Sequence, residues 1–205
     1  MTELRSYGDA CGIARALDVI GERWALLIVR ELAYGPKRFS DLRGGLGLSP
    51  NVLSQRLADL EASGVLERRT LSGLYELTPW GRELHPLLLQ LGRWGARALH
   101  KPGGELSADA LMLALEATFL PSQAGELRAS YELRLGEEHF TVEVRDKHLS
   151  VARGSPRAPD AVIETDPATL RALAFGDRKL SGAAAQIHGD ARLVRAFFRL
   201  FARPT

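Results

Sequence analysis

A Pro-Gly-Gly break at residues 102–104 divides this chain of 205 residues into two halves. Helical periodicity runs up to the break, and a new apolar helix begins after Ser107. Proline and glycine together interrupt regular structure, and a domain takes roughly 100–200 residues. We therefore predict two small domains, at residues 1–101 and 106–205.

The first half is predicted to hold helices and one hairpin. Ser49 and Pro50 are a typical N-cap and first residue of a helix, and Gly64 is a typical stop. Pro86 is expected to kink the last helix, because proline removes a backbone donor. The predicted helices are 11–20, 24–33, 39–46, 50–63 and 79–99, and the strands are 65–69 and 75–78.

The second half mixes strands that alternate apolar and polar residues with helices. The residues between Ser107 and Leu120 are apolar nearly all round, which is typical of a buried helix. The predicted strands are 131–135, 140–144, 149–151 and 161–164, and the helices are 107–120, 167–175 and a last one after Asp190. Strands followed by helices indicate an α+β domain. The whole chain is thus predicted to be α+β, with a mainly α first domain that carries a β-hairpin.

Three helices, a capped fourth helix and a hairpin are the element order of a winged helix-turn-helix, whose capped helix enters the DNA major groove. A helical wheel that turns Leu53 and Leu57 inward turns Asn51 and Gln55 outward, with Ser54 beside them. Asn and Gln can each bond an adenine with two hydrogen bonds. This outward face therefore suits the reading of base edges.

Basic side chains near the capped helix and on the hairpin can contact phosphates. Arg56 lies nearer the buried side, so it is either a phosphate contact or a structural ion pair. The candidate DNA-binding residues are Lys37, Arg38, Ser49, Asn51, Ser54, Gln55, Arg56, Arg68 and Arg69. The alternative is that they are ordinary solvated surface residues.

The net charge of the chain is +2, which excludes a histone-like basic protein and does not by itself indicate a nucleic-acid partner. Divided at the break, the charge is +3 over residues 1–101 and −1 over the rest. The positive charge therefore lies in the half that holds the candidate DNA-binding residues.

The first half resembles the HxlR-type family of bacterial winged helix-turn-helix regulators from Cys11 to Leu99. The matching stretches are 16–24 (ALDVIGERW), 35–42 (GPKRFSDL), 48–57 (LSPNVLSQRL), 60–64 (LEASG) and 75–84 (YELTPWGREL). The resemblance implies a homodimeric transcription factor that binds double-stranded DNA through residues 50–63. One departure is the hairpin tip at residues 71–74, which is short and lacks the proline and charges typical of the family.

The long helix after Thr78 carries a stripe of apolar and aromatic residues, which are candidates for the dimer interface: Trp80, Leu84, Leu88, Leu91 and Trp94. The alternative is that the stripe packs on its own domain. A two-fold dimer would present two recognition helices to a pseudo-palindromic operator.

The second half resembles a sterol-carrier-protein-like domain at residues 166–170 (DPATL), Leu173, Gly176, Ala184, 187–190 (IHGD) and Phe197. Such folds can leave an apolar tunnel, so an apolar effector is expected. The candidate lining residues are Tyr131, Leu133, Phe140, Val142, Leu149, Phe175, Phe197 and Phe201. Residue by residue, the alternative is that these side chains only fill a core.

Cys11 is the single cysteine, which excludes an intrachain disulfide and a cysteine-rich zinc site. Some regulators that this chain resembles sense oxidants through a cysteine near the N-terminus, so Cys11 is a candidate redox-sensing residue. A sensor thiol needs exposure and a lowered pKa. The alternative is a small buried residue at the start of the first helix.

The sequence shows no Walker-type loop, no nucleophile elbow and no metal-ligand spacing among its five histidines. We therefore predict that the protein is not an enzyme and that it uses neither a cofactor nor a metal. With no apolar signal core and no long apolar run, a cytoplasmic location without membrane association is expected. An alternative function is a lipid or acyl-chain carrier whose winged helix serves assembly.

Overall fold

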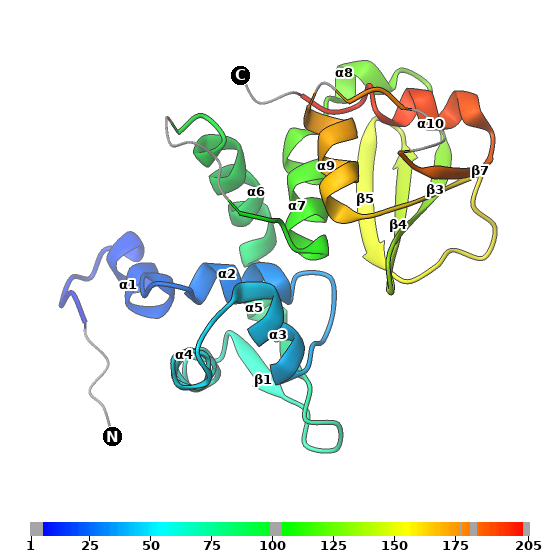
Figure 1. The fold of residues 1–205 in the computed structure, drawn as a ribbon. Coiled ribbons are helices and arrows are strands. Elements are labelled where there is room, and N and C mark those ends of the chain that lie inside the picture. Colours follow the sequence, from blue (N-terminus) through cyan, green and yellow to red (C-terminus); the bar gives the residue numbers. More distant parts are fainter. Residues whose placement is uncertain (1–5, 99–103, 177, 181–183, 203–205) are drawn as a thin grey trace. The chain divides into compact units, whose positions relative to one another are not determined.

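The computed structural model describes residues 6–98, 104–176, 178–180 and 184–202. The chain forms two compact units, Met1–Leu88 and Leu89–Thr205, which we call the first and the second unit (Figure 1). The predicted boundary falls on residues 101–106, of which 101–103 lie outside the described residues. The units instead divide inside helix α6 (Leu84–Gly95). The reason is that Arg93 of α6 donates to the carbonyl oxygen of Ala117 at 2.6 Å, so the end of α6 packs within the second unit.

The first unit contains the predicted helices and the predicted hairpin. Its elements are α1 (Gly12–Ile20), α2 (Ala25–Glu31), α3 (Phe39–Leu46), α4 (Pro50–Ala62), β1 (Leu66–Arg68), β2 (Tyr75–Leu77), α5 (Pro79–Arg82) and the start of α6. The strands β1 and β2 are antiparallel, with Leu66 opposite Leu77. The core of this unit includes the fully buried side chains of Ile28, Leu42 and Leu53.

The helix predicted over residues 79–99 is interrupted, but not where it was expected. The break lies at Glu83, between α5 and α6, and Pro86 stands in the first turn of α6. The N–H groups of a first turn have no partner inside the helix, so proline is tolerated there without a kink. The interruption upstream places Pro86 at such a position.

Gly81 holds α5 against the hairpin. A Cβ atom at this position would stand 1.9 Å from the carbonyl oxygen of Val65, so any side chain would force the two segments apart. The Thr78 hydroxyl group donates to the carbonyl oxygen of Gly64 at 2.7 Å and accepts from the N–H of Gly81 at 3.0 Å. These contacts fix the start of α5 to the base of the hairpin.

The second unit is an α+β domain with a five-stranded sheet. Its elements after the end of α6 are α7 (Ala108–Thr118), α8 (Pro121–Ala124), β3 (Ala129–Leu135), β4 (Glu138–Arg145), β5 (His148–Arg153), β6 (Ala161–Thr165), α9 (Pro167–Phe175), β7 (Gln186–Gly189) and α10 (Ala191–Phe197). The strand order is β5-β4-β3-β6-β7, and β3 and β6 run parallel. Helix α7 packs on β5 and α9, and α10 packs on β6 and β7 (Figure 1).

Two short elements of this unit were not predicted from the sequence, the helix α8 and the strand β7. The strand β7 has only four residues, and three of them are exposed. It therefore lacks the alternation of apolar and polar residues that marks a half-buried strand. Its place at the sheet edge comes from pairing with β6, where Ile187 lies opposite Ile163.

The two faces of the sheet differ in polarity. One face carries buried apolar side chains, and the other carries a buried carboxylate, Glu132, which is 3% exposed. Glu132 accepts hydrogen bonds from Arg134 at 3.0 Å and from the Ser155 hydroxyl group at 2.6 Å, and it contacts Nδ1 of His139 at 3.0 Å. These partners, Arg134 first, lower the pKa of Glu132 to about 2. The polar face is thus held together around one carboxylate.

No helix in the described part of the chain has the length and the apolar character needed to cross a membrane.

Candidate nucleic-acid interface

The turn between α3 and α4 sets the direction of the capped helix. Gly47 ends α3 with φ 63°, a left-handed conformation that glycine adopts at no steric cost. Leu48 then enters the core, and the Ser49 hydroxyl oxygen accepts from the N–H of Val52 at 3.5 Å. With Pro50 as its first residue, α4 begins as the sequence predicts.

The two faces of α4 are separated as predicted. Leu53, Leu57 and Leu60 are buried in the first unit. Asn51, Ser54 and Gln55 are exposed near the N-terminal end of the helix. A polar face of this kind, presented at the start of a helix, can reach base edges in a major groove.

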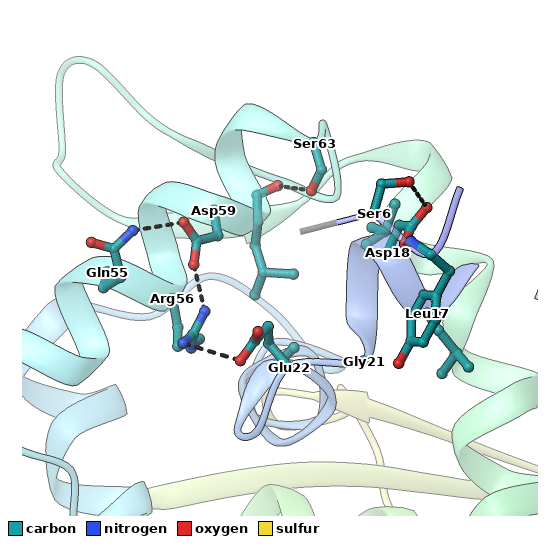
Figure 2. A pocket seen from close by; sticks show the side chains of 13 residues that line it. Ser6, Leu17, Asp18, Gly21, Glu22, Gln55, Arg56, Asp59 and Ser63 are labelled. Atoms are coloured by element: carbon teal, nitrogen blue, oxygen red, sulfur yellow. Dashed lines mark hydrogen bonds and ion pairs between the residues drawn. The ribbon is translucent and has the colours of Figure 1, made fainter. Parts of the chain in front are cut away.

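One carboxylate holds two of the candidate residues. Asp59 accepts from Nε2 of Gln55 at 2.7 Å and from Nη1 of Arg56 at 2.6 Å (Figure 2). Arg56 also pairs with Glu22, which precedes α2, at 3.3 Å. This geometry favours the structural ion pair over the phosphate contact for Arg56. Asp59 was not among the predicted site residues, although its spacing of three and four residues from Arg56 and Gln55 is a known signal for contact on a helix.

The two basic residues before α3 have different surroundings. Arg38 is exposed, and its backbone N–H donates to the carboxylate of Asp41 at 3.1 Å. Lys37 is 9% exposed, and its Nζ lies 2.9 Å from the carboxylate of Glu31, which is fully buried. The backbone of Lys37 is paired with Tyr75 of the hairpin. Arg38, which is already exposed, can therefore contact a phosphate. Lys37 would first have to move its ammonium group out of the interior.

The hairpin presents two arginines. Arg68 lies over the ring of Tyr75, 5.7 Å from its centre. Arg69 donates to Glu76 through Nη2 at 2.7 Å, and this pair raises the pKa of Arg69 and lowers that of Glu76. Arg69 would have to leave Glu76 in order to contact a phosphate.

Cys11 is exposed and forms the N-cap of α1. The interpretation of a buried residue is therefore wrong, because α1 begins at the surface and covers no core at this end. Hydrogen bonds from the backbone N–H groups of Ile13 and Ala14 lower the pKa of its thiol. This environment meets the two requirements for a reactive thiol.

The predicted apolar stripe is divided between interior and surface. Leu88 is buried and Leu84 is half-buried. Trp80, Leu91 and Trp94 are exposed, and Trp94 is 67% exposed. Leu88 thus packs within its own domain, as the alternative interpretation of the stripe states. Trp80, Leu91 and Trp94 instead leave apolar surface exposed on α5 and α6.

The predicted effector-lining residues lie in the second unit. Tyr131, Leu133, Phe140, Val142, Phe197 and Phe201 are buried, and Leu149 and Phe175 are half-buried. The ring of Phe197 lies 4.9 Å from that of Tyr131 and 5.0 Å from that of Phe201. These aromatic side chains pack on one another.

The family model for the HxlR-like helix-turn-helix matches residues 19–102. The helix-turn-helix transcriptional regulator YvaP of Bacillus subtilis is 38% identical over 86 residues, which cover 39% of this chain and 80% of YvaP. The chain belongs to the HxlR-like helix-turn-helix family. This confirms the first resemblance seen in the sequence.

Two further proteins each match less than half of this chain. A transcriptional regulator of Mycobacterium tuberculosis is 39% identical over 105 residues, which cover 49% of this chain. The matched part spans 65% of the length of that mycobacterial relative. The crystal structure of the regulator YtcD has 35% sequence identity and a TM-score of 0.40, and the match covers 42% of this chain and 94% of that chain. These relatives are named as transcriptional regulators, which supports the prediction that the matched part of the chain is not an enzyme.

Proposed function

We propose that this HxlR-like protein is a bacterial transcriptional regulator that binds double-stranded DNA as a homodimer at a pseudo-palindromic operator. The observation that carries the proposal is the exposed polar face of α4, with Asn51, Ser54 and Gln55 beside the capped end of the helix. Membership of a helix-turn-helix family supports it. Because DNA is the partner, we expect the protein to act in the cytoplasm.

A gel shift with DNA from upstream of its own gene tests the proposal, with Gln55→Ala and Arg38→Ala as a matched pair. Gln55→Ala should relax sequence preference and lose about 1–3 kcal/mol of discrimination at one base pair. Arg38→Ala should weaken binding to all sequences about equally and reduce the salt slope by about 1.

Glu137→Gln, a change at an exposed position in the turn between β3 and β4, is the control and should bind as the wild type does. Equal behaviour of Gln55→Ala and Arg38→Ala would contradict the division between base and phosphate contacts. Absence of binding at low salt, with the protein folded, would overturn the regulator and favour the lipid or acyl-chain carrier.

Apolar surface on two helices supports the homodimer. The helix α1 has no buried residue, and its Ile13 is 72% exposed. On α6, Leu91 and Trp94 are exposed as well. Large exposed apolar patches mark sites of interaction with other proteins, membranes or ligands. A second copy of the chain, pairing through Ile13 of α1 and through α6, would cover these exposed side chains.

Leu91→Asp should convert the dimer to a monomer, because it places a charge in the apolar surface of α6. Size-exclusion chromatography with light scattering should then give half the wild-type mass. Leu71→Asp is the matched control, since Leu71 is fully exposed at the hairpin tip, outside the proposed interface. A wild-type protein that elutes as a monomer at micromolar concentration contradicts the dimer.

For the second unit, the proposal is a sterol-carrier-like domain that binds an apolar effector and so changes the spacing of the recognition helices. Its support is a five-stranded sheet with helices packed on it and an aromatic core around Phe197. An effector would change DNA affinity only if it prefers one spacing. Cys11 remains the candidate redox-sensing residue, because its thiol is exposed and has a lowered pKa.

A further inference from the structure

A pocket of about 820 Å³ opens in the first unit between α4, α1 and the segment that precedes α1. Gln55, Arg56 and Asp59 line it from α4, and Asp18 and Glu22 line it from the side of α1. Figure 2 shows the group of Gln55, Arg56 and Asp59 apart from Asp18, with the pocket between them. Its volume is within the range of about 300–1,000 Å³ that holds small organic ligands.

The polar groups of this pocket carry an excess of negative charge. Three carboxylates line it, those of Asp18, Glu22 and Asp59, against one guanidinium group, that of Arg56. Arg56 contacts both Asp59 and Glu22, at 2.6 and 3.3 Å. The charge of Asp18 lies apart from this group and meets neutral donors, the Ser6 hydroxyl group at 3.0 Å and a backbone N–H at 2.8 Å.

The remaining lining is largely apolar and includes Leu17, Val19, Ala25 and Leu60. The aromatic residue Tyr7 also belongs to the lining. An apolar wall favours an apolar or aromatic ligand body, and an aromatic ring also attracts a cation. The carboxylates would repel an anionic ligand, and an uncharged ligand would form no ion pair with them.

We propose that this pocket binds a small organic cation, an ammonium group carried on an apolar or aromatic body. The ammonium group lies between Asp18 and Glu22, and the apolar body lies against Leu17 and Leu60. This site is separate from the aromatic core of the second unit, and its occupant has the opposite character to an uncharged lipid.

The pocket also shares a residue with the proposed DNA-binding face. Gln55 lines the pocket and is held by Asp59, which also holds Arg56. A cation near Glu22 competes with Arg56 and changes the charge around Asp59, and so it changes the freedom of the Gln55 amide group. If the proposed DNA binding holds, ligand and DNA affect the affinity of each other reciprocally.

Three naphthalene probes test the site on the full chain without DNA: 2-naphthylmethylamine, 2-naphthylmethanol and 2-naphthylacetate. Titrations followed by naphthalene fluorescence should give a Kd for the amine about tenfold lower than for the other two. Glu22→Gln and Asp18→Asn should each raise the Kd of the amine about fivefold. Glu61→Gln, an exposed change on α4 outside the lining, should leave it unchanged.

Equal affinities for the three probes would overturn the proposal, as would an equal loss in Glu61→Gln and Glu22→Gln. Asp18 also holds the segment before α1, so circular dichroism checks the fold of Asp18→Asn, and Glu22→Gln tests the charge at a half-exposed side chain. Since no DNA is present, a failed gel shift leaves this result intact. The two proposals therefore fail separately.

Discussion

Glu31→Ala should lower the free energy of unfolding of the first unit by about 3–5 kcal/mol, because it removes the carboxylate from a buried ion pair. The side chain of Glu31 is fully buried and contacts the Lys37 ammonium group and the Arg30 guanidinium group, each at 2.9 Å. Removing it leaves a lysine inside the protein without this counter-charge. Urea unfolding followed by circular dichroism measures the loss.

Hydrogen exchange read by mass spectrometry shows where the loss of Glu31→Ala arises, and the added exchange should be confined to residues 6–88. Glu67→Ala is the control, since this exposed carboxylate on β1 should change stability by less than about 0.5 kcal/mol. A change below about 1 kcal/mol in Glu31→Ala contradicts the importance of the ion pair.

Phe197→Ala should lower the free energy of unfolding of the second unit by about 3–5 kcal/mol, because it opens a cavity in a close-packed core. Its ring is fully buried and lies between those of Tyr131 and Phe201. The Tyr131 hydroxyl group donates to the carbonyl oxygen of Leu193 at 3.1 Å, and burial raises the pKa of Tyr131 to about 12. The helix α10 is thus fixed to the sheet by both contacts.

The neighbouring Phe198 is the matched control for this cavity. It is half-buried, and its ring lies 5.3 Å from that of Phe197. Phe198→Ala should therefore cost clearly less, about 1–2 kcal/mol. Hydrogen exchange should assign the effect of Phe197→Ala to the second unit. Equal losses in the two variants would show that the core does not depend on the position of Phe197.

The fold of the first unit was largely predictable, because its signals are local. Ser49 and Pro50 mark the start of α4, and the leucines at helical spacing mark its buried face. The environment of Lys37 was not predictable in the same way. Its partner Glu31 lies in another element, and nothing in the spacing of the two residues indicates a buried pair.

Three features of the structure were not predictable from the local sequence pattern. The strand β7 has no alternating pattern and exists because β6 offers it an edge. The interruption at Glu83 depends on the proline three residues later, which belongs in a first turn and not at a kink. The pocket beside α4 joins residues from the segment before α1, from α1, from the start of α2 with the loop before it, and from α4, so no single motif could reveal it.

The parallel pairing of β3 with β6 has a consequence for how the chain folds. The strands β3, β4 and β5 follow one another as antiparallel neighbours, so their contacts are close in sequence. The pairing of β3 with β6 instead joins residues 131 and 161, and it must wait for the closure of a loop. The first unit, made mainly of local helical contacts, should fold faster. On the ribosome its residues also emerge before those of the second unit, so α4 can form before the sheet of the second unit closes.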